Sequence, residues 1–165
     1  MFEQGSLVIY GVHGICKIIK FENLIVDKKK IEYYVLEPVK QPGAHYYVPT
    51  QNKAAVAKMS PILTKDQIEE LLLSPDIANN VWIPDENVRK QRYRELINSG
   101  DRVALISMVK SIYQHKEMLI PQGKKLHICD ENFLRDAKGL LNAEFSIVLG
   151  INQEDVGDYI QKSIK

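Results

Sequence analysis

The chain has 165 residues, of which 45% are hydrophobic and 26% are charged, and its formal net charge is +1. This is the composition of an ordinary globular protein, and the length allows one average domain or two small ones. No stretch approaches the roughly 18 apolar residues that cross a bilayer, and the first residues lack a signal peptide's basic and apolar regions, so we expect a cytoplasmic protein with no membrane contact.

Residues 2–18 predict the opening of a small, strongly bent β-barrel. They form two short runs rich in β-branched and aromatic residues, interrupted by Gly5, Gly11 and Gly14. Glycine inside a strand pattern marks a bulge, a tight bend or a close backbone approach. A flat sheet needs no such series of bends, so we expect the sheet to curl.

The following segments predict the rest of this barrel. Residues 20–26 follow the opening strands, and the alternation of residues 31–36 indicates a half-buried strand. Residues 45–49 form a short strand that ends in proline, and residues 54–59 are expected to complete the sheet. Five short strands within about sixty residues fit a small barrel of the SH3 or Tudor type.

From Thr64 onward the pattern is helical. Thr64 and Gln67 match a capping box, a helix is predicted over residues 85–98 with Ser99-Gly100 as its end, and Asp101 is placed to cap the next helix. A later helix ends at Gly150, and a last short one follows Asn152. The apolar positions of that later helix lie at helical spacing: Leu134, Ala137, Leu141, Phe145 and Val148.

The predicted fold class is therefore α+β, with a barrel domain over residues 1–60 and a helical domain over residues 61–165. Residues 1–63 carry eight lysines against five acidic residues, and the remainder carries fourteen basic against sixteen acidic residues. Within that acidic part, residues 89–125 hold nine basic and three acidic residues. A locally basic surface on a near-neutral protein indicates contact with a polyanion.

The sequence offers few groups for catalysis or metal binding. The histidines are scattered without zinc-ligand spacing: His13, His45, His115 and His127. There is no phosphate-binding loop and no nucleophile elbow. Cys16 and Cys129 lie far apart and are expected to be free thiols. We predict no enzymatic activity, no catalytic residue, no metal and no cofactor, and a structural role for His13 between its two glycines.

Two pairs of tyrosines mark the barrel half, Tyr33-Tyr34 and Tyr46-Tyr47. Tyrosines either build a small core or serve as interface residues with a large rigid area and one polar tip. Neighbours in a strand point to opposite faces, so one tyrosine of each pair is expected in the core. An exposed edge strand beside them could accept a strand from a partner.

Basic residues gather on the predicted helix and again later in the chain: Arg89, Lys90, Arg92, Arg94, Lys110, Lys116, Lys124 and Lys125. Such residues either bind a phosphate backbone or form a solvated face. The single tryptophan, Trp82, lies in the connection just before this helix. It either covers the helical core or acts as an apolar wedge between bases.

Several motifs, taken in order, resemble one family. They are Phe2-x-x-Gly5, Val8 to Gly14, Tyr33 to Leu36, Val48-Pro49, Ser99-Gly100-Asp101, and Asp130-Glu131-x-x-Leu134-x-x-Ala137. Together they are similar to the CarD/CdnL family of bacterial transcription regulators, and the likeness covers nearly the whole chain. The N-terminal module of that family is similar to the polymerase-interacting domain of transcription-repair coupling factor.

The resemblance implies that the barrel pairs a strand edge with the β subunit of RNA polymerase. It also implies that the helical domain contacts promoter DNA at the upstream edge of the bubble and places a tryptophan in the minor groove, which stabilises the open complex. The implied polymerase-binding residues are Asn23, Lys28, Tyr46, Tyr47, Val48 and Pro49. The predicted DNA-binding residues are Trp82, Arg89, Lys90, Arg92, Arg94, Lys124 and Lys125.

The chain departs from the family pattern at two places. Tyr47 stands where well-known members place an arginine, and Ile83-Pro84 with several polar residues separates Trp82 from the basic helix. We expect a monomeric transcription factor that binds DNA without sequence preference. The alternative is a protein–protein adaptor that uses the barrel edge and does not touch DNA.

Overall fold

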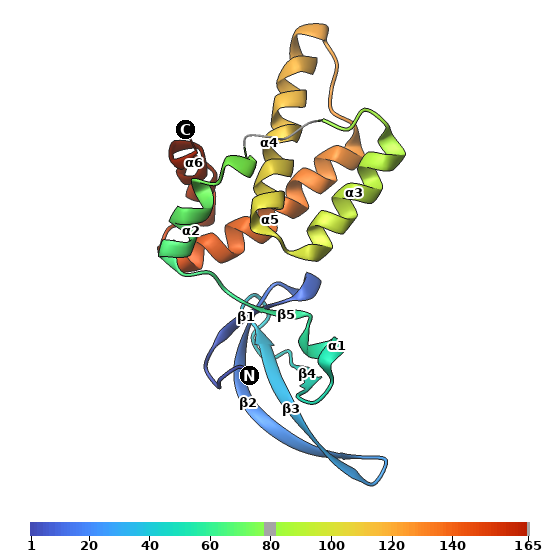
Figure 1. Cartoon of the computed structure of the whole chain (residues 1–165), viewed down its shortest axis with the longest axis vertical. Helices are drawn as coiled ribbons and strands as arrows, with labels where there is room; N and C mark the ends of the chain where they lie inside the picture. The colour runs from blue at the N-terminus through green and yellow to red at the C-terminus, as the bar shows by residue number, and fades with distance from the viewer. Residues whose placement is uncertain (78–81, 165) are drawn as a thin grey trace. The chain divides into compact units, whose positions relative to one another are not determined.

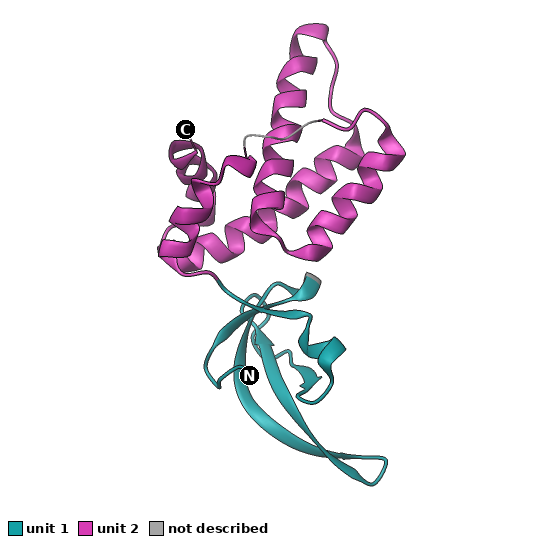
Figure 2. Ribbon diagram, in the orientation of Figure 1, with its two compact units in different colours: residues 1–62 teal, residues 63–165 magenta. Residues whose placement is uncertain are grey.

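Residues 1–62 form an antiparallel sheet and the rest of the chain forms helices (Figure 1). The computed structural model describes residues 1–77 and 82–164. It divides into two units, Met1–Ile62 and Leu63–Lys165, here called the sheet unit and the helical unit (Figure 2). The segregation of strands and helices confirms the predicted α+β class.

The sheet unit holds five strands in the order β4-β3-β2-β1-β5, and every neighbouring pair is antiparallel. Its elements are β1 (Leu7–Tyr10), the 3₁₀ turn η1 (Gly11–His13), β2 (Ile15–Val26), β3 (Lys29–Pro38), β4 (Tyr46–Pro49), α1 (Lys53–Val56) and β5 (Met59–Pro61). The edges of the sheet are therefore β4 and β5.

The sheet curls, as the glycines predict. Gly11 and Gly14 flank η1 with φ of 48° and 75°, a backbone region that glycine adopts readily. β1 and β4 are three strand spacings apart in the sheet order, about 14 Å if the sheet were flat. Yet the rings of Tyr10 and Tyr46 lie 5.8 Å apart, centroid to centroid. Only a bent sheet brings these strands so close.

β2 and β3 form one hairpin of long strands, where the sequence analysis expected short ones. β2 continues through a bulge between Ile18 and Lys20, because no glycine or proline interrupts it there. The turn residues Asp27 and Lys28 have φ of 51° and 64°, which is the positive φ that a two-residue hairpin turn needs.

The prediction of a strand over residues 54–59 is wrong for most of that segment. Residues Lys53–Val56 form α1, and the Asn52 side chain caps it by accepting a hydrogen bond from Ala55 N at 3.1 Å. Two alanines in this turn favour helix, and only Met59–Pro61 joins the sheet, beside β1.

The core of the sheet unit confirms part of the tyrosine prediction. Tyr34 is 2% exposed and belongs to the core, whereas its neighbour Tyr33 is half-buried. The remaining buried members of this core are Val8, Cys16, Ile18, Leu36, Val48 and Met59. Alternation along β3 therefore separates an inner from an outer tyrosine.

The helical unit contains α2 (Lys65–Leu72), the 3₁₀ turn η2 (Pro75–Ile77), α3 (Glu86–Ser99), α4 (Arg102–Leu119), the 3₁₀ turn η3 (Ile120–Gln122), α5 (Ile128–Leu149) and α6 (Gln153–Ser163). The structure confirms the predicted caps of α2 and α4, and α3 begins one residue later than predicted because Asp85 is its cap rather than its first residue. Thr64 and Gln67 form the capping box of α2, and Asp85 and Asp101 accept hydrogen bonds from Val88 N and Ala104 N.

α5 lies against its neighbours through the predicted apolar stripe. Leu134, Ala137, Leu141 and Phe145 are at most 8% exposed, and Val148 packs at the margin of the same core. Within residues 1–77 and 82–164, no helix has the length and apolarity that crossing a membrane requires.

Candidate functional site

Trp82 is held against the helical unit by two flat side chains. Its ring stacks on His115 of α4 with a centroid separation of 3.7 Å and an interplanar angle of 4°. The guanidinium carbon of Arg89 lies 4.3 Å from the centroid of the same ring, a cation–π contact. Trp82 remains half-buried, and its ring is fixed in orientation rather than free to rotate.

Arg89 makes a buried, bidentate ion pair with Asp130 at the start of α5. Arg89 Nε and Nη2 donate to Asp130 Oδ1 and Oδ2, both at 2.8 Å. The two side chains are 3% and 1% exposed. Arg89 Nη1 also donates to the carbonyl of Ile83 at 2.9 Å. The N–H donors of the Arg89 guanidinium are thus used inside the protein. They link the backbone of Ile83 to Asp130 of α5.

This geometry corrects the prediction that Arg89 contacts DNA. A guanidinium that is buried and fully hydrogen-bonded does not face a phosphate. Arg89 and Tyr93 point to the core, whereas Arg92 points outward. Arg89 is a positioning residue for the segment that carries Trp82.

The other basic residues of α3 are exposed or half-buried. Lys90 Nζ lies 2.8 Å from Glu86 Oε1, and this pairing raises the pKa of Lys90 and lowers that of Glu86. Arg92 lies 3.6 Å from Glu95 in an exposed pair, which is weak in water. Arg94 is exposed, and within the described residues it has no ion-pair partner.

Lys124 and Lys125 lie in the loop that leads from η3 to α5, and both are exposed without an ion pair to any residue that the structure describes. The start of α5 also adjoins the start of α3, since Cys129 Sγ donates to Glu86 Oε1 at 3.7 Å. The first turns of α3 and α5 therefore come together, each beside basic residues.

Burial decides the protonation of the aromatic groups around Arg89. The pKa of His115 is lowered, mainly by burial and next by the positive charge of Arg89. Burial raises the pKa of Tyr93 to about 12. His115 is therefore neutral at neutral pH and stacks on Trp82 as an uncharged ring.

In the sheet unit, β4 is an edge strand whose outer side has no strand neighbour within the sheet. Tyr47 is 44% exposed and meets Tyr33 edge-on at 6.2 Å, whereas Tyr46 is half-buried with its ring 4.3 Å from that of His13. Val48 is fully buried. Its side chain cannot meet a partner, so only its backbone is available for strand pairing.

The remaining sites predicted on the sheet unit separate into two places. Asn23 and Pro49 line one shallow hollow beside the end of β4. Lys28 lies in the hairpin turn, five residues before Tyr33, which is paired with Pro49. At about 3.3 Å per residue the turn lies roughly 16 Å along the hairpin from that pair. The structure brings Asn23 to β4 and leaves Lys28 at the far tip.

Comparison with protein families shows to which family the chain belongs. The family model for the CarD-like/TRCF RID domain matches residues 2–63, and that for the CarD C-terminal domain matches residues 68–161. The chain belongs to the CarD-like family. No curated protein matches the chain. Its two CarD domains make it a transcription-related factor that interacts with RNA polymerase, and they are regulatory and interaction domains rather than enzymes.

Sequence reasoning missed two residues of this CarD-like site, Asp130 and His115. Asp130 was noted only as part of a family motif, since an acidic residue in the first turn of a helix normally stabilises the helix dipole. His115 was dismissed with the other histidines because it has no metal-ligand spacing. No local pattern indicates that either one meets Arg89 or Trp82 across 33 or more positions of sequence.

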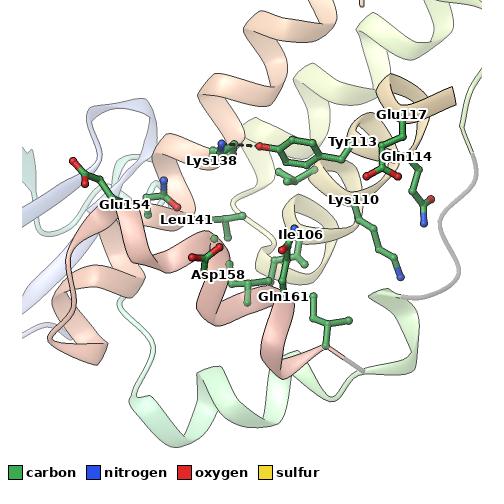
Figure 3. A pocket seen from close by; sticks show the side chains of 15 residues that line it. Ile106, Lys110, Tyr113, Gln114, Glu117, Lys138, Leu141, Glu154, Asp158 and Gln161 are labelled. Carbon is green, nitrogen blue, oxygen red and sulfur yellow. Dashed lines mark hydrogen bonds between the residues drawn. The ribbon is translucent and has the colours of Figure 1, made fainter. Parts of the chain in front are cut away.

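A hollow of the CarD C-terminal domain lies elsewhere, between α4, α5 and α6 (Figure 3). This cavity of about 460 Å³ has Ile106 and Leu141 among its lining residues, and Lys138 Nζ donates to Tyr113 Oη at 2.8 Å on its wall. None of the predicted site residues lines it. The described residues also contain no group of three or more His, Cys, Asp or Glu able to hold a metal ion.

Proposed function

We propose that this CarD-like chain binds the β subunit of RNA polymerase through the edge of β4 and stabilises open promoter complexes through its helical unit. One observation carries the DNA part of the proposal. A half-buried tryptophan, fixed by Arg89 and His115, lies at the end of the unit where α3 and α5 begin beside basic residues.

The unpaired side of β4 supports the polymerase contact, because an exposed edge strand can accept a partner strand through backbone hydrogen bonds. Tyr47 takes the place of the family's arginine. Its exposed ring, supported by Tyr33, offers apolar area and one hydroxyl. The contact at this position is then apolar, where the family uses a charge.

Arg94, Lys124 and Lys125 are the best placed phosphate ligands, because no carboxylate among the described residues neutralises them. Lys90 and Arg92 contribute less, since each exchanges a carboxylate partner for a phosphate. Trp82 enters the minor groove with its free edge while its stacked faces stay on the protein. A preference of about 1.4 kcal/mol for melted over closed DNA shifts the equilibrium tenfold.

The test is the lifetime of open complexes formed by polymerase, promoter and the full chain. Trp82→Ala and Arg94→Ala should shorten that lifetime without loss of polymerase binding, whereas Tyr47→Ala should weaken polymerase binding itself. Leu73→Ala, at an exposed position 78% accessible in the same unit, is the control. Unchanged lifetimes for both DNA variants would favour the adaptor, in which the helical unit does not touch DNA.

A further inference from the structure

The end of the helical unit where α4 leads into α5 exposes three large apolar side chains. Met118, Ile120 and Ile128 are 65%, 65% and 76% exposed. They make up half of the six exposed large hydrophobic residues in the described part of this unit, the others being Leu73, Val88 and Ile147. Residues 116–128 run from the end of α4 through η3 and along the connecting stretch to the start of α5 (Figure 1), and we call this segment the α4–α5 tip.

The tip is an ordered turn with an inside and an outside. Gly123 N donates to Ile120 O at 3.0 Å, and Lys124 N donates to Leu119 O at 3.1 Å. Leu126 is 7% exposed and belongs to the core, and Leu119 packs against that core. The tip therefore already buries its own apolar anchors, and Met118, Ile120 and Ile128 are left over on the outside.

The same segment carries three cations. Lys116, Lys124 and Lys125 are exposed, and none forms an ion pair with a residue that the structure describes. Glu117 is the one acidic residue between positions 116 and 128. A partner that complements this surface carries negative charge around an apolar face. Duplex DNA offers that combination, with phosphates on either side of the sugar edges of its minor groove.

The tip also continues the surface that carries Trp82. His115 stacks on Trp82, and Met118 follows three residues later, on the same face of α4. At 1.5 Å per residue Met118 lies about 4.5 Å farther along the helix axis. Trp82, His115 and Met118 therefore form one strip that leads to the tip.

We propose that the α4–α5 tip extends the DNA contact of the helical unit: Lys116 binds a phosphate beside those bound by Lys124 and Lys125, and the exposed apolar side chains pack on the sugar edges of the minor groove. This rests on the proposed function, because it assigns the same partner to the helical unit. It adds an apolar contact that is separate from Trp82.

The test is binding of the full chain to a fluorescein-labelled duplex, followed by anisotropy at several salt concentrations. Met118→Gln with Ile120→Gln should weaken binding about tenfold and leave the dependence on salt unchanged, because no phosphate contact is lost. Lys124→Ala with Lys125→Ala should lower the slope of log affinity against log salt by about 2, close to one unit per phosphate contact. Leu73→Gln, at a position that is also exposed (78%) but outside the tip, should bind as the wild type does.

The outcomes separate this proposal from the proposed function. If the glutamine pair binds DNA as tightly as the wild type, the apolar contact is refuted, whether or not the lysine pair weakens binding. If the glutamine pair instead lowers affinity for polymerase alone, the tip is a protein interface and the proposal fails. Trp82→Ala reports on the proposed function independently: a normal Trp82→Ala chain with a defective tip variant would reject the wedge and support the tip.

Discussion

Replacing Asp130 by asparagine should destabilise the helical unit severely. The substitution removes the negative charge opposite Arg89 while keeping nearly the same volume. Arg89 is 3% exposed and its Nε and Nη2 both point at Asp130 at 2.8 Å, so its charge cannot reach water without opening the packing. Breaking a buried pair by removing one partner costs about 3–5 kcal/mol. We expect a loss of about 3 kcal/mol for Asp130→Asn, since the amide oxygen still accepts one hydrogen bond.

The single tryptophan makes the assay direct. Trp82 lies over Arg89, so urea denaturation followed by its fluorescence reports on the helical unit alone, with far-UV circular dichroism as the second probe. In a thermal scan with the same probe, a loss of about 3 kcal/mol should lower the midpoint temperature of a 100-residue unit by more than about 10 °C. The native fluorescence spectrum should also change before unfolding, because Arg89, which lies over the indole, loses the carboxylate that holds it in place.

Two matched variants complete this test. Glu95→Gln removes the carboxylate of the exposed Arg92 pair on the same helix and should cost less than about 0.5 kcal/mol. Arg89→Met with Asp130→Leu replaces both charges by apolar groups and should recover most of the stability that Asp130→Asn loses. A cost below about 1 kcal/mol for Asp130→Asn would refute the assignment of Arg89 as a buried, paired charge.

Three further outcomes follow from single contacts. Because the pKa of His115 is lowered in the native chain, the unfolded chain takes up a proton there first, and stability falls as the pH drops below about 6.5. The difference in the free energy of unfolding between about pH 7.5 and about pH 5.5, measured by urea denaturation, should therefore be smaller for His115→Phe than for the wild type. Burial raises the pKa of Cys16 to about 11, so a thiol reagent should modify Cys129 and spare Cys16 in the native protein, as peptide mass spectrometry can show. Asp101→Ala removes the cap bond from Ala104 N and should cost about 1 kcal/mol in denaturant unfolding.

The sequence predicted the helical unit well because its signals are local. A cap places a polar side chain within three residues of the amide that it binds, as Thr64 and Gln67 do at α2. The apolar stripe of α5 likewise needs only the period of one helix. Both signals are contained in a short window of sequence, so they could be identified without knowledge of the partner elements.

The sheet unit was predicted less accurately for the same reason. Residues 54–56 form a helix because the helix propensity of alanine and the Asn52 cap outweigh the pairing that a strand would gain in the sheet. The hairpin continues past Ile18 because β3 supplies a partner along its whole length. Strand length is set by the neighbouring strand, which lies outside any local window.

The basic helix shows where charge patterns stop being informative. Four basic residues of α3 have chemically similar side chains and yet differ in setting: Arg89 is buried and paired, Lys90 and Arg92 are paired near the surface, and Arg94 has no ion-pair partner among the described residues. Which arginine turns inward is decided by Asp130, 41 residues away. A count of basic residues overestimates the charge of this helix that is available to a polyanion, because Arg89 is used to hold the tryptophan.

That use of Arg89 has a physical rationale in the placement of Trp82. In the proposed function Trp82 is a wedge, and fixing its orientation before it meets DNA raises its affinity, since ordering a free side chain on binding reduces the affinity gained. A buried ion pair contributes little net stability, because desolvation offsets most of the Coulomb attraction. Its directional fork does constrain geometry: it fastens Ile83 by a hydrogen bond and covers the indole of Trp82. The pair is therefore better explained by preorganisation of the tryptophan than by the stability of the fold.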